Sequence, residues 1–266
     1  MTGSGNDFVM VDARLSAVAD WTAADMAAVC ARGTGIGADG LVFVGPGSQD
    51  GAARMVYFNS DGSRAAMCGN AALCATRLAA RLEIAPAAGM RLETDAAIYE
   101  SRCAGPGHQA ELHLAPVSPP SELSALKTIA GERRIALGVV GVPHLVVQVD
   151  DVDAVDLAAR GRELRFHDAI APDGANVNFI SPGSGPSEWR MRTYERGIEG
   201  ETLACGTGAV TAACALASWG LTPFPVHIVT RTGKLLSIQG RRTVADLYDD
   251  VWLGGEARLV FRGVVA

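Results

Sequence analysis

The segment from Cys205 to Trp219 contains no charged residue and is rich in alanine. Its length and composition predict a helix, and a helix without a polar face is expected to lie inside a domain. A second segment, from about Cys68 to Leu82, is nearly as apolar in its first turns and becomes basic only toward its C-terminal end, where cations suit the helix dipole. We therefore expect two central helices wrapped by sheet.

Short runs of β-type residues dominate the rest of the chain, and many are separated by Gly, Pro, Asp or Ser turns. This spacing favours antiparallel sheet over regular alternation of strands and helices. The expected strands are Phe8–Val11, Gly40–Val44, Arg54–Phe58, Glu111–Leu114, Leu145–Val149, Ala175–Ile180, Trp189–Tyr194, Val226–Val229 and Glu256–Phe261.

Prolines are concentrated between Ala115 and Ser121, which predicts an extended linker between two domains. We expect an N-terminal domain at 1–115 and a C-terminal domain at 116–255, with a final strand near 256–266 as a candidate to return to the first. The halves also resemble each other, because an aromatic strand end and a glycine-containing loop precede Cys-Gly in both. Duplication is the simplest explanation.

The composition excludes several classes of protein. A net charge of −6 on 266 residues provides no basic surface for nucleic acid, and no Lys/Arg cluster is dense enough for an anionic membrane. No segment approaches the roughly 18 to 20 apolar residues of a spanning helix, and the first residues do not form a signal sequence. We expect a cytoplasmic protein with a small-molecule ligand. The six cysteines include no C-x-x-C pair, which argues against a zinc site and a disulfide framework.

Cys68 and Cys205 each stand at the start of a predicted helix and are each followed by glycine. Unpaired N–H groups and the positive end of the dipole can lower a thiol pKa there from about 8.5 to between about 3.5 and 7.5. The same N–H groups would bind a carboxylate. Two such cysteines could flank one α-carbon, so that a thiolate removes a proton on one face while a thiol delivers one on the other. Alternatively, each cysteine is simply a small buried hydrophobic residue.

At these residues the sequence closely resembles the diaminopimelate epimerases over nearly its whole length. The motifs that carry the resemblance are Gly3-Ser-Gly-Asn-Asp-Phe-Val, Gly35-Ile-Gly-Ala-Asp-Gly-Leu, Phe58-Asn-Ser-Asp-Gly-Ser, Met67-Cys-Gly-Asn, Pro143-His, Asn176-Val-Asn-Phe, Tyr194-Glu-Arg-Gly and Glu201-Thr-Leu-Ala-Cys-Gly-Thr-Gly. The resemblance implies an α/β (α+β) fold of two similar domains, each a mixed, largely antiparallel sheet rolled around a central helix. It also implies an active site in the interdomain cleft.

By position, the resemblance implies a cofactor-independent epimerase that interconverts LL- and meso-diaminopimelate in lysine and peptidoglycan precursor synthesis, without metal or pyridoxal phosphate. We expect a homodimer. Its implied acid/base pair is Cys68 and Cys205, assisted by His144 and Glu195. The implied substrate-binding residues are Gly69, Asn70, Gly206 and Thr207 for the reacting end and Asn6, Asn59, Asn176 and Arg196 for the rest. Arg196 offers a bidentate fork for a distal carboxylate.

The chain departs from the family pattern in several places. Ala71 and Leu73 replace the usual Gly and Arg after the first cysteine, and Val142 replaces the common Asn before Pro-His. The loop from Gly197 to Glu201 is one residue longer than the commonest form, so Glu199 either compensates or changes the approach of Arg196. Met1 falls a few residues late, which suggests a missed start or a trimmed chain. These departures leave the exact substrate open.

Three other functions remain as alternatives. Another two-cysteine amino-acid racemase of the same fold, such as a histidine racemase, would not need Arg196. A binding protein that holds an amino acid without inverting it would need neither cysteine. An isomerase that uses carboxylate chemistry would have an acidic residue in place of a cysteine at a helix start, and the sequence has none there.

Overall fold

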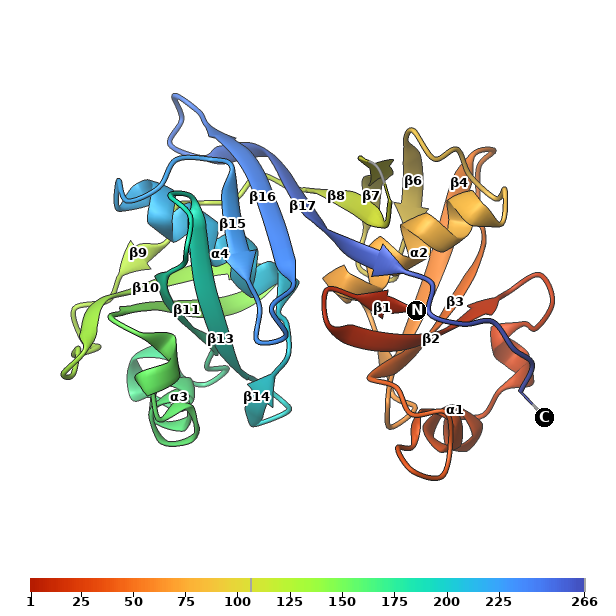
Figure 1. Ribbon diagram of the computed structural model, residues 1–266, viewed down its shortest axis with the longest axis horizontal. Helices are drawn as coiled ribbons and strands as arrows, with labels where there is room; N and C mark the ends of the chain where they lie inside the picture. The colour runs from red at the N-terminus through yellow and green to blue at the C-terminus, as the bar shows by residue number, and fades with distance from the viewer. Residues whose placement is uncertain (106, 266) are drawn as a thin grey trace. The chain divides into compact units, whose positions relative to one another are not determined.

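The computed structural model describes residues 1–105 and 107–265, which form two compact units (Figure 1). Unit 1 comprises Met1–Leu114 and the segment that begins at Gly254, and unit 2 comprises Ala115–Leu253. The chain therefore passes between the units twice, once after Leu114 and once within strand β17 (Tyr248–Arg258).

Unit 1 is built around helix α2 (Gly69–Arg81), which is buried along most of its length and packs against strands on several sides (Figure 1). Its other elements are β1 (Thr2–Gly3), β2 (Asn6–Asp12), α1 (Ala23–Cys30), β3 (Gly40–Pro46), β4 (Ala52–Asn59), β5 (Arg64–Ala65), β6 (Met90–Glu93), β7 (Ile98–Ala104) and β8 (Gln109–Leu114). Strand β3 is buried over six consecutive residues, which explains its unbroken apolar sequence.

Unit 2 is built in the same way around helix α4 (Gly206–Ser218), the uncharged helix predicted from the sequence. It packs against β10, β11, β12, β15 and β16, while α3 covers β12–β14. The elements of this unit are β9 (Ser121–Glu122), β10 (Glu132–Val140), β11 (Val142–Val149), α3 (Leu157–Arg165), β12 (Asn176–Pro182), β13 (Glu188–Glu195), β14 (Gly200–Thr202), β15 (Val226–Val229) and β16 (Leu235–Arg242). Short 3₁₀ helices complete the chain at η1 (Val18–Asp20), η2 (Val152–Ala154) and η3 (Asp168–Ile170).

The two units share one strand topology. In unit 1, β2 is parallel to β3, β3 is antiparallel to β4, and β4 is antiparallel to β5 and parallel to β6. In unit 2, β11 is parallel to β12, β12 is antiparallel to β13, and β13 is antiparallel to β14 and parallel to β15. In each unit the central helix follows the short β5 or β14 strand. A duplication would produce this arrangement, and the predicted α+β fold of mixed, mostly antiparallel sheets around central helices is confirmed.

The last predicted strand, Glu256–Phe261, is placed wrongly. Strand β17 begins earlier, at Tyr248, and ends at Arg258. Tyr248, Val251 and Leu253 are buried, whereas Val260 and Phe261 are exposed, so the apolar residues at the end of the run have no core to pack against. The predicted linker is tied to this strand, because Val117 and Tyr248 exchange two backbone hydrogen bonds of 2.8 Å.

Candidate active site

Cys68 and Cys205 are the residues from which α2 and α4 begin. Both have extended backbone angles, φ −143° and ψ 119° for Cys68 and φ −131° and ψ 104° for Cys205, and neither side chain caps its helix. The carbonyl of each cysteine accepts the first helical hydrogen bond, at 2.9 Å, from the amide four residues ahead. The thiols therefore leave the N–H groups of the first turn uncapped, as an anion site requires.

Two other cysteines in the same helices lie in a different environment. Cys74 and Cys214 are 0 % exposed, and burial raises the pKa of each to about 12. Cys68, by contrast, is only partly buried, and Cys205 is 8 % exposed with its Sγ 3.8 Å from Thr207 Oγ1. Of the four cysteines in these two helices, the pair at the helix starts is therefore better placed to react than Cys74 and Cys214.

Asn6 and Asn70 form a hydrogen-bonded pair beside Cys68 in unit 1. Asp39 fixes the direction of the pair, because its carboxylate can only accept and therefore binds Asn6 Nδ2, at 2.8 Å. Asn6 Oδ1 then accepts from Asn70 Nδ2 at 2.7 Å. The remaining atom, Asn70 Oδ1, is buried and has no hydrogen-bond partner among the described residues. The pair therefore presents a buried acceptor suited to an N–H donor such as an ammonium group.

Asp39 is itself held in place by Arg32. The Arg32 guanidinium bonds Asp39 Oδ1 at 2.8 Å and both carboxylate oxygens of Asp7, at 2.7 and 3.0 Å. Despite desolvation, which acts in the opposite direction, the bonds to Arg32 and Asp39 lower the pKa of the Asp7 carboxyl. Asp39 lies in the Gly-Ile-Gly-Ala-Asp-Gly motif, but sequence reasoning assigned it no role.

Asn59, the last residue of β4, uses its side chain locally. Its Nδ2 donates to Ser63 Oγ at 3.0 Å across the turn into β5, and its backbone N–H donates to Ser63 O at 2.9 Å. The amide is therefore fixed by its own turn.

His144 is wholly buried in unit 2 against the amides of Asn176 and Asn178. The parallel pairing of β11 with β12 places it opposite Asn176. Asn176 Oδ1 accepts from the Arg196 N–H at 2.8 Å, and Asn178 Oδ1 accepts from Thr193 Oγ1 at 2.9 Å. Both amides therefore direct Nδ2 at His144 Nδ1, at 3.5 and 3.4 Å.

These neighbours determine the tautomer of His144. Nδ1 faces two donors and must accept, so the proton of the neutral ring is on Nε2. Nε2 makes no hydrogen bond of good geometry to any residue that the structure describes, although the Val140 backbone lies near enough to favour the protonated form. Burial, followed by the positive charge of Arg196, lowers the pKa of His144 from 6.5 to about 3. His144 is therefore a neutral hydrogen-bonding group at physiological pH.

Asn178 was not predicted as a site residue, although it stands two positions after Asn176 in a strand and so shares its face. Its Oδ1 also restricts the start of α4. A Cβ added to Gly208 would lie 2.3 Å from Asn178 Oδ1 and 3.1 Å from Cys205 Sγ. Only glycine fits at position 208, and this lets the helix start approach the polar group around His144.

Glu195 and Arg196 end strand β13 and begin the loop to β14. Glu195 pairs with Gly200 across this hairpin, and Asn176 holds the Arg196 backbone. The predicted site residues are therefore divided between the two units. The unit 1 group is Asn6, Cys68, Gly69 and Asn70, with Asn59 at the end of β4, and the unit 2 group is His144, Asn176, Glu195, Arg196, Cys205, Gly206 and Thr207.

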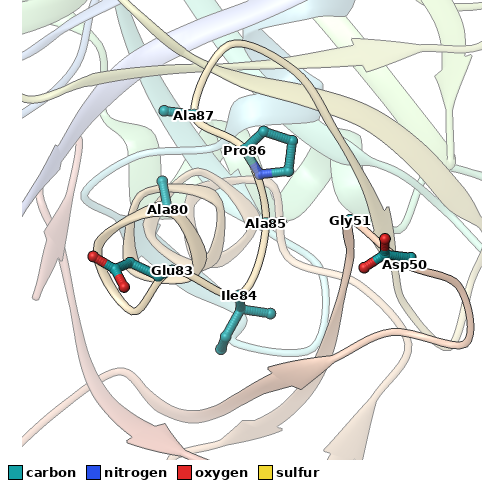
Figure 2. A pocket seen from close by; sticks show the side chains of 8 residues that line it. All are labelled: Asp50, Gly51, Ala80, Glu83, Ile84, Ala85, Pro86 and Ala87. Carbon is teal, nitrogen blue, oxygen red and sulfur yellow. The ribbon is translucent and has the colours of Figure 1, made fainter.

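A separate hollow of about 430 Å³ lies at the other end of α2, lined by Asp50, Gly51, Glu83 and Ile84 with their neighbours (Figure 2). A helix of this length places it on the order of 20 Å from Cys68, so it is not part of the site. Within residues 1–105 and 107–265, no three His, Cys, Asp or Glu side chains are grouped to bind a metal. No helix in the same ranges is both long and apolar enough to cross a membrane.

Solved structures with the same fold include a phenazine biosynthesis protein of the PhzF family from Bacillus anthracis. It has a TM-score of 0.72 at 15% identity and covers 96% of this chain and 92% of its own. A methylitaconate-delta-isomerase matches with a TM-score of 0.64 at 12% identity, over 99% of this chain and 93% of its own. At these identities the likeness concerns the fold alone.

The diaminopimelate epimerase family model matches residues 1–117 and 137–244. The diaminopimelate epimerase of Gemmatimonas aurantiaca is 43% identical over 100% of this chain and 98% of its own length. The diaminopimelate epimerase of Aquifex aeolicus is 39% identical over 99% of this chain and 95% of its own. The chain belongs to the diaminopimelate epimerase family.

Proposed function

We propose that this enzyme interconverts LL- and meso-diaminopimelate, a step in lysine biosynthesis, by a two-base mechanism that uses Cys68 and Cys205. The observation that carries the mechanism is the matched placement of these cysteines, each at the start of a buried central helix with an uncapped first turn. Family membership favours this substrate over that of the racemase alternative.

In the proposed reaction, N–H groups of both first turns hold the α-carboxylate, with Gly69 and Asn70 on one helix and Gly206 and Thr207 on the other. One cysteine thiolate takes the α-proton, so that a C–H bond breaks and an S–H bond forms. The carbanion is stabilised as the carboxylate gains enediolate character against these N–H groups. The other thiol then gives its proton to the opposite face. Each unit must supply one cysteine, and no cofactor or metal is needed.

The remaining groups would orient the substrate. His144, neutral at physiological pH, cannot donate as an imidazolium and would act through hydrogen bonds, whereas Glu195 can accept an N–H. Asn6, Asn59 and Asn176 would bind the polar groups of the substrate, and Arg196 would bind the distal carboxylate. We further propose a cytoplasmic enzyme that works as a homodimer, to be tested by sedimentation.

The test offers the purified protein LL-diaminopimelate and a panel of polar L-amino acids without pyridoxal phosphate, and follows chirality. We expect inversion of diaminopimelate, and Arg196→Met should lose about 3 to 5 kcal/mol of transition-state binding, with Arg196→Lys in between. Arg133→Met, which removes an exposed ion pair with Asp150, is the matched control. Better inversion of a monocarboxylic amino acid, or full activity of Arg196→Met, would favour the racemase alternative.

A further inference from the structure

The loop between β13 and β14 contains Arg196. Hydrogen bonds between Glu199 and the backbone of Glu195 and Gly197 hold this loop in one conformation. Glu199 has left-handed backbone angles, with φ 54°, and its N–H donates to Glu195 O at 2.8 Å. Its Oε1 accepts from the N–H of Gly197 at 3.1 Å. Since Asn176 Oδ1 holds the N–H of Arg196, the backbone is fixed at two successive amides.

Arg165, the last residue of α3, connects this loop to the body of unit 2. Its Nη2 lies 3.2 Å from Glu199 Oε1, and its Nη1 donates to Asp173 O at 3.1 Å. The guanidinium is stacked over Phe166 at 4.6 Å, and only 11% of the side chain is exposed. A Cβ on Gly174, which has φ +63°, would lie 2.0 Å from Nη1, so the chain can pass over Arg165 only with glycine there.

The pairing leaves one buried atom of each side chain without a partner in the part of the chain that the structure describes, although 32% of the Glu199 side chain as a whole is exposed. Among the described residues, Arg165 Nε and Glu199 Oε2 are both buried and have no hydrogen-bond partner. An ion pair that is partly exposed and incompletely hydrogen-bonded contributes little to stability. Its contacts do, however, connect the loop to the end of α3.

We infer that Glu199 and Arg165 form a positioning pair that holds Arg196 in the orientation needed to bind the second carboxylate of a dicarboxylic substrate. This inference deepens the proposed function and depends on it. Glu199 acts on the backbone beside Arg196, and Arg165 anchors Glu199 to α3. In this way Glu199 would keep Arg196 in place although the loop is one residue longer than the commonest family form. Neither side chain needs to touch the substrate.

The test is a pair of double-mutant cycles on KM and kcat for diaminopimelate. Glu199→Gln keeps an acceptor for Gly197 and removes the charge, Glu199→Ala removes both, and Arg165→Met removes the anchor. We expect KM to rise about tenfold in Glu199→Ala and Arg165→Met, with a smaller change in kcat and a partial loss in Glu199→Gln. Asp249→Asn, which breaks the exposed pair with Arg241 in the same unit, is the matched control and should retain parental values.

The deciding comparison places the same substitutions in the Arg196→Met background. If the pair acts through Arg196, they should change kcat/KM there by less than about twofold. Equal losses in both backgrounds would show a purely structural role and overturn the inference.

Amide exchange at Gly197, measured without substrate, provides a second readout. We expect the Gly197 amide to exchange faster in Glu199→Ala than in the parent. An unchanged exchange rate would contradict the positioning role of Glu199. If the parent did not turn over diaminopimelate, the proposed function would be overturned. The exchange measurement would still test whether Glu199 holds the loop backbone.

Discussion

Asn70 Nδ2 donates to Asn6 Oδ1 across 2.7 Å, and Asp39 fixes the direction of this bond by accepting from Asn6 Nδ2. Asn70→Asp should therefore place a carboxylate oxygen against Asn6 Oδ1, with two acceptors face to face. We expect a loss of about 1 to 3 kcal/mol in the free energy of unfolding, measured in urea.

The double variant Asp39→Asn with Asn70→Asp is the control for that prediction. An amide at position 39 can donate, which allows Asn6 to turn over and donate to the new carboxylate. Part of the lost stability should return. A double variant that is as unstable as the sum of its single changes would contradict the assigned amide directions.

Gly208→Ala should impair both stability and catalysis. The new methyl would lie 2.3 Å from Asn178 Oδ1, which is itself bonded to Thr193, and 3.1 Å from Cys205 Sγ. We expect a cost of about 1 to 3 kcal/mol from overpacking and a fall in kcat/KM of about tenfold or more as the thiol shifts. Gly89→Ala, where nothing lies within 4 Å, should behave as the parent in both assays.

His144 should make the protein less stable as pH falls. Its folded pKa, about 3, lies below the unfolded value near 6.5, so the unfolded chain binds a proton first. The contribution to stability is fully present above about pH 6.5 and declines by up to about 1.4 kcal/mol per pH unit as pH falls toward 3. Urea unfolding at a series of pH values gives the free energy of unfolding as a function of pH. This free energy should depend less steeply on pH in His144→Gln, whereas the same change at the exposed His108 should leave the pH dependence unaltered.

Thiol alkylation should separate the cysteines by environment. Cys74 and Cys214 are fully buried, with pKa values raised to about 12, so their thiolate fraction is on the order of a thousandfold below that of an ordinary thiol. Iodoacetamide at neutral pH should modify Cys68 long before either of them, as read by peptide mass. Early labelling of Cys74 or Cys214 in folded protein would rule out this assignment.

The central helices α2 and α4 could be predicted because segments with so little charge have nowhere to lie except inside a sheet. Helix α3 could not, since its sequence is mostly polar and contains Gly161. Its stability comes from tertiary packing, in which Leu157 and Leu164 are buried and a Cβ on Gly161 would lie 2.6 Å from Tyr194. Strand β10 was missed for a similar reason, because its first residues are charged.

Some residues of the candidate site could likewise be predicted from the sequence, and others could not. The positions of Cys68 and Cys205 at the helix starts follow from local sequence, but the roles of Asp39 and Asn178 depend on which strands become neighbours. Asn178 lies near His144 only because β11 is parallel to β12 in one register. A single sequence does not specify that pairing.

The most direct measurement of the two-base claim is solvent labelling during epimerisation in D2O. The reaction starts from LL-diaminopimelate, and deuterium at Cα is measured early in both the product and the remaining substrate. Because the cysteine that removes the substrate proton is distinct from the one that delivers the solvent-derived deuteron, we expect deuterium in the product while the remaining substrate is still unlabelled. Equal early labelling of substrate and product would contradict it, since a single base that removes the α-proton, exchanges it with solvent and returns a deuteron to either face would label both.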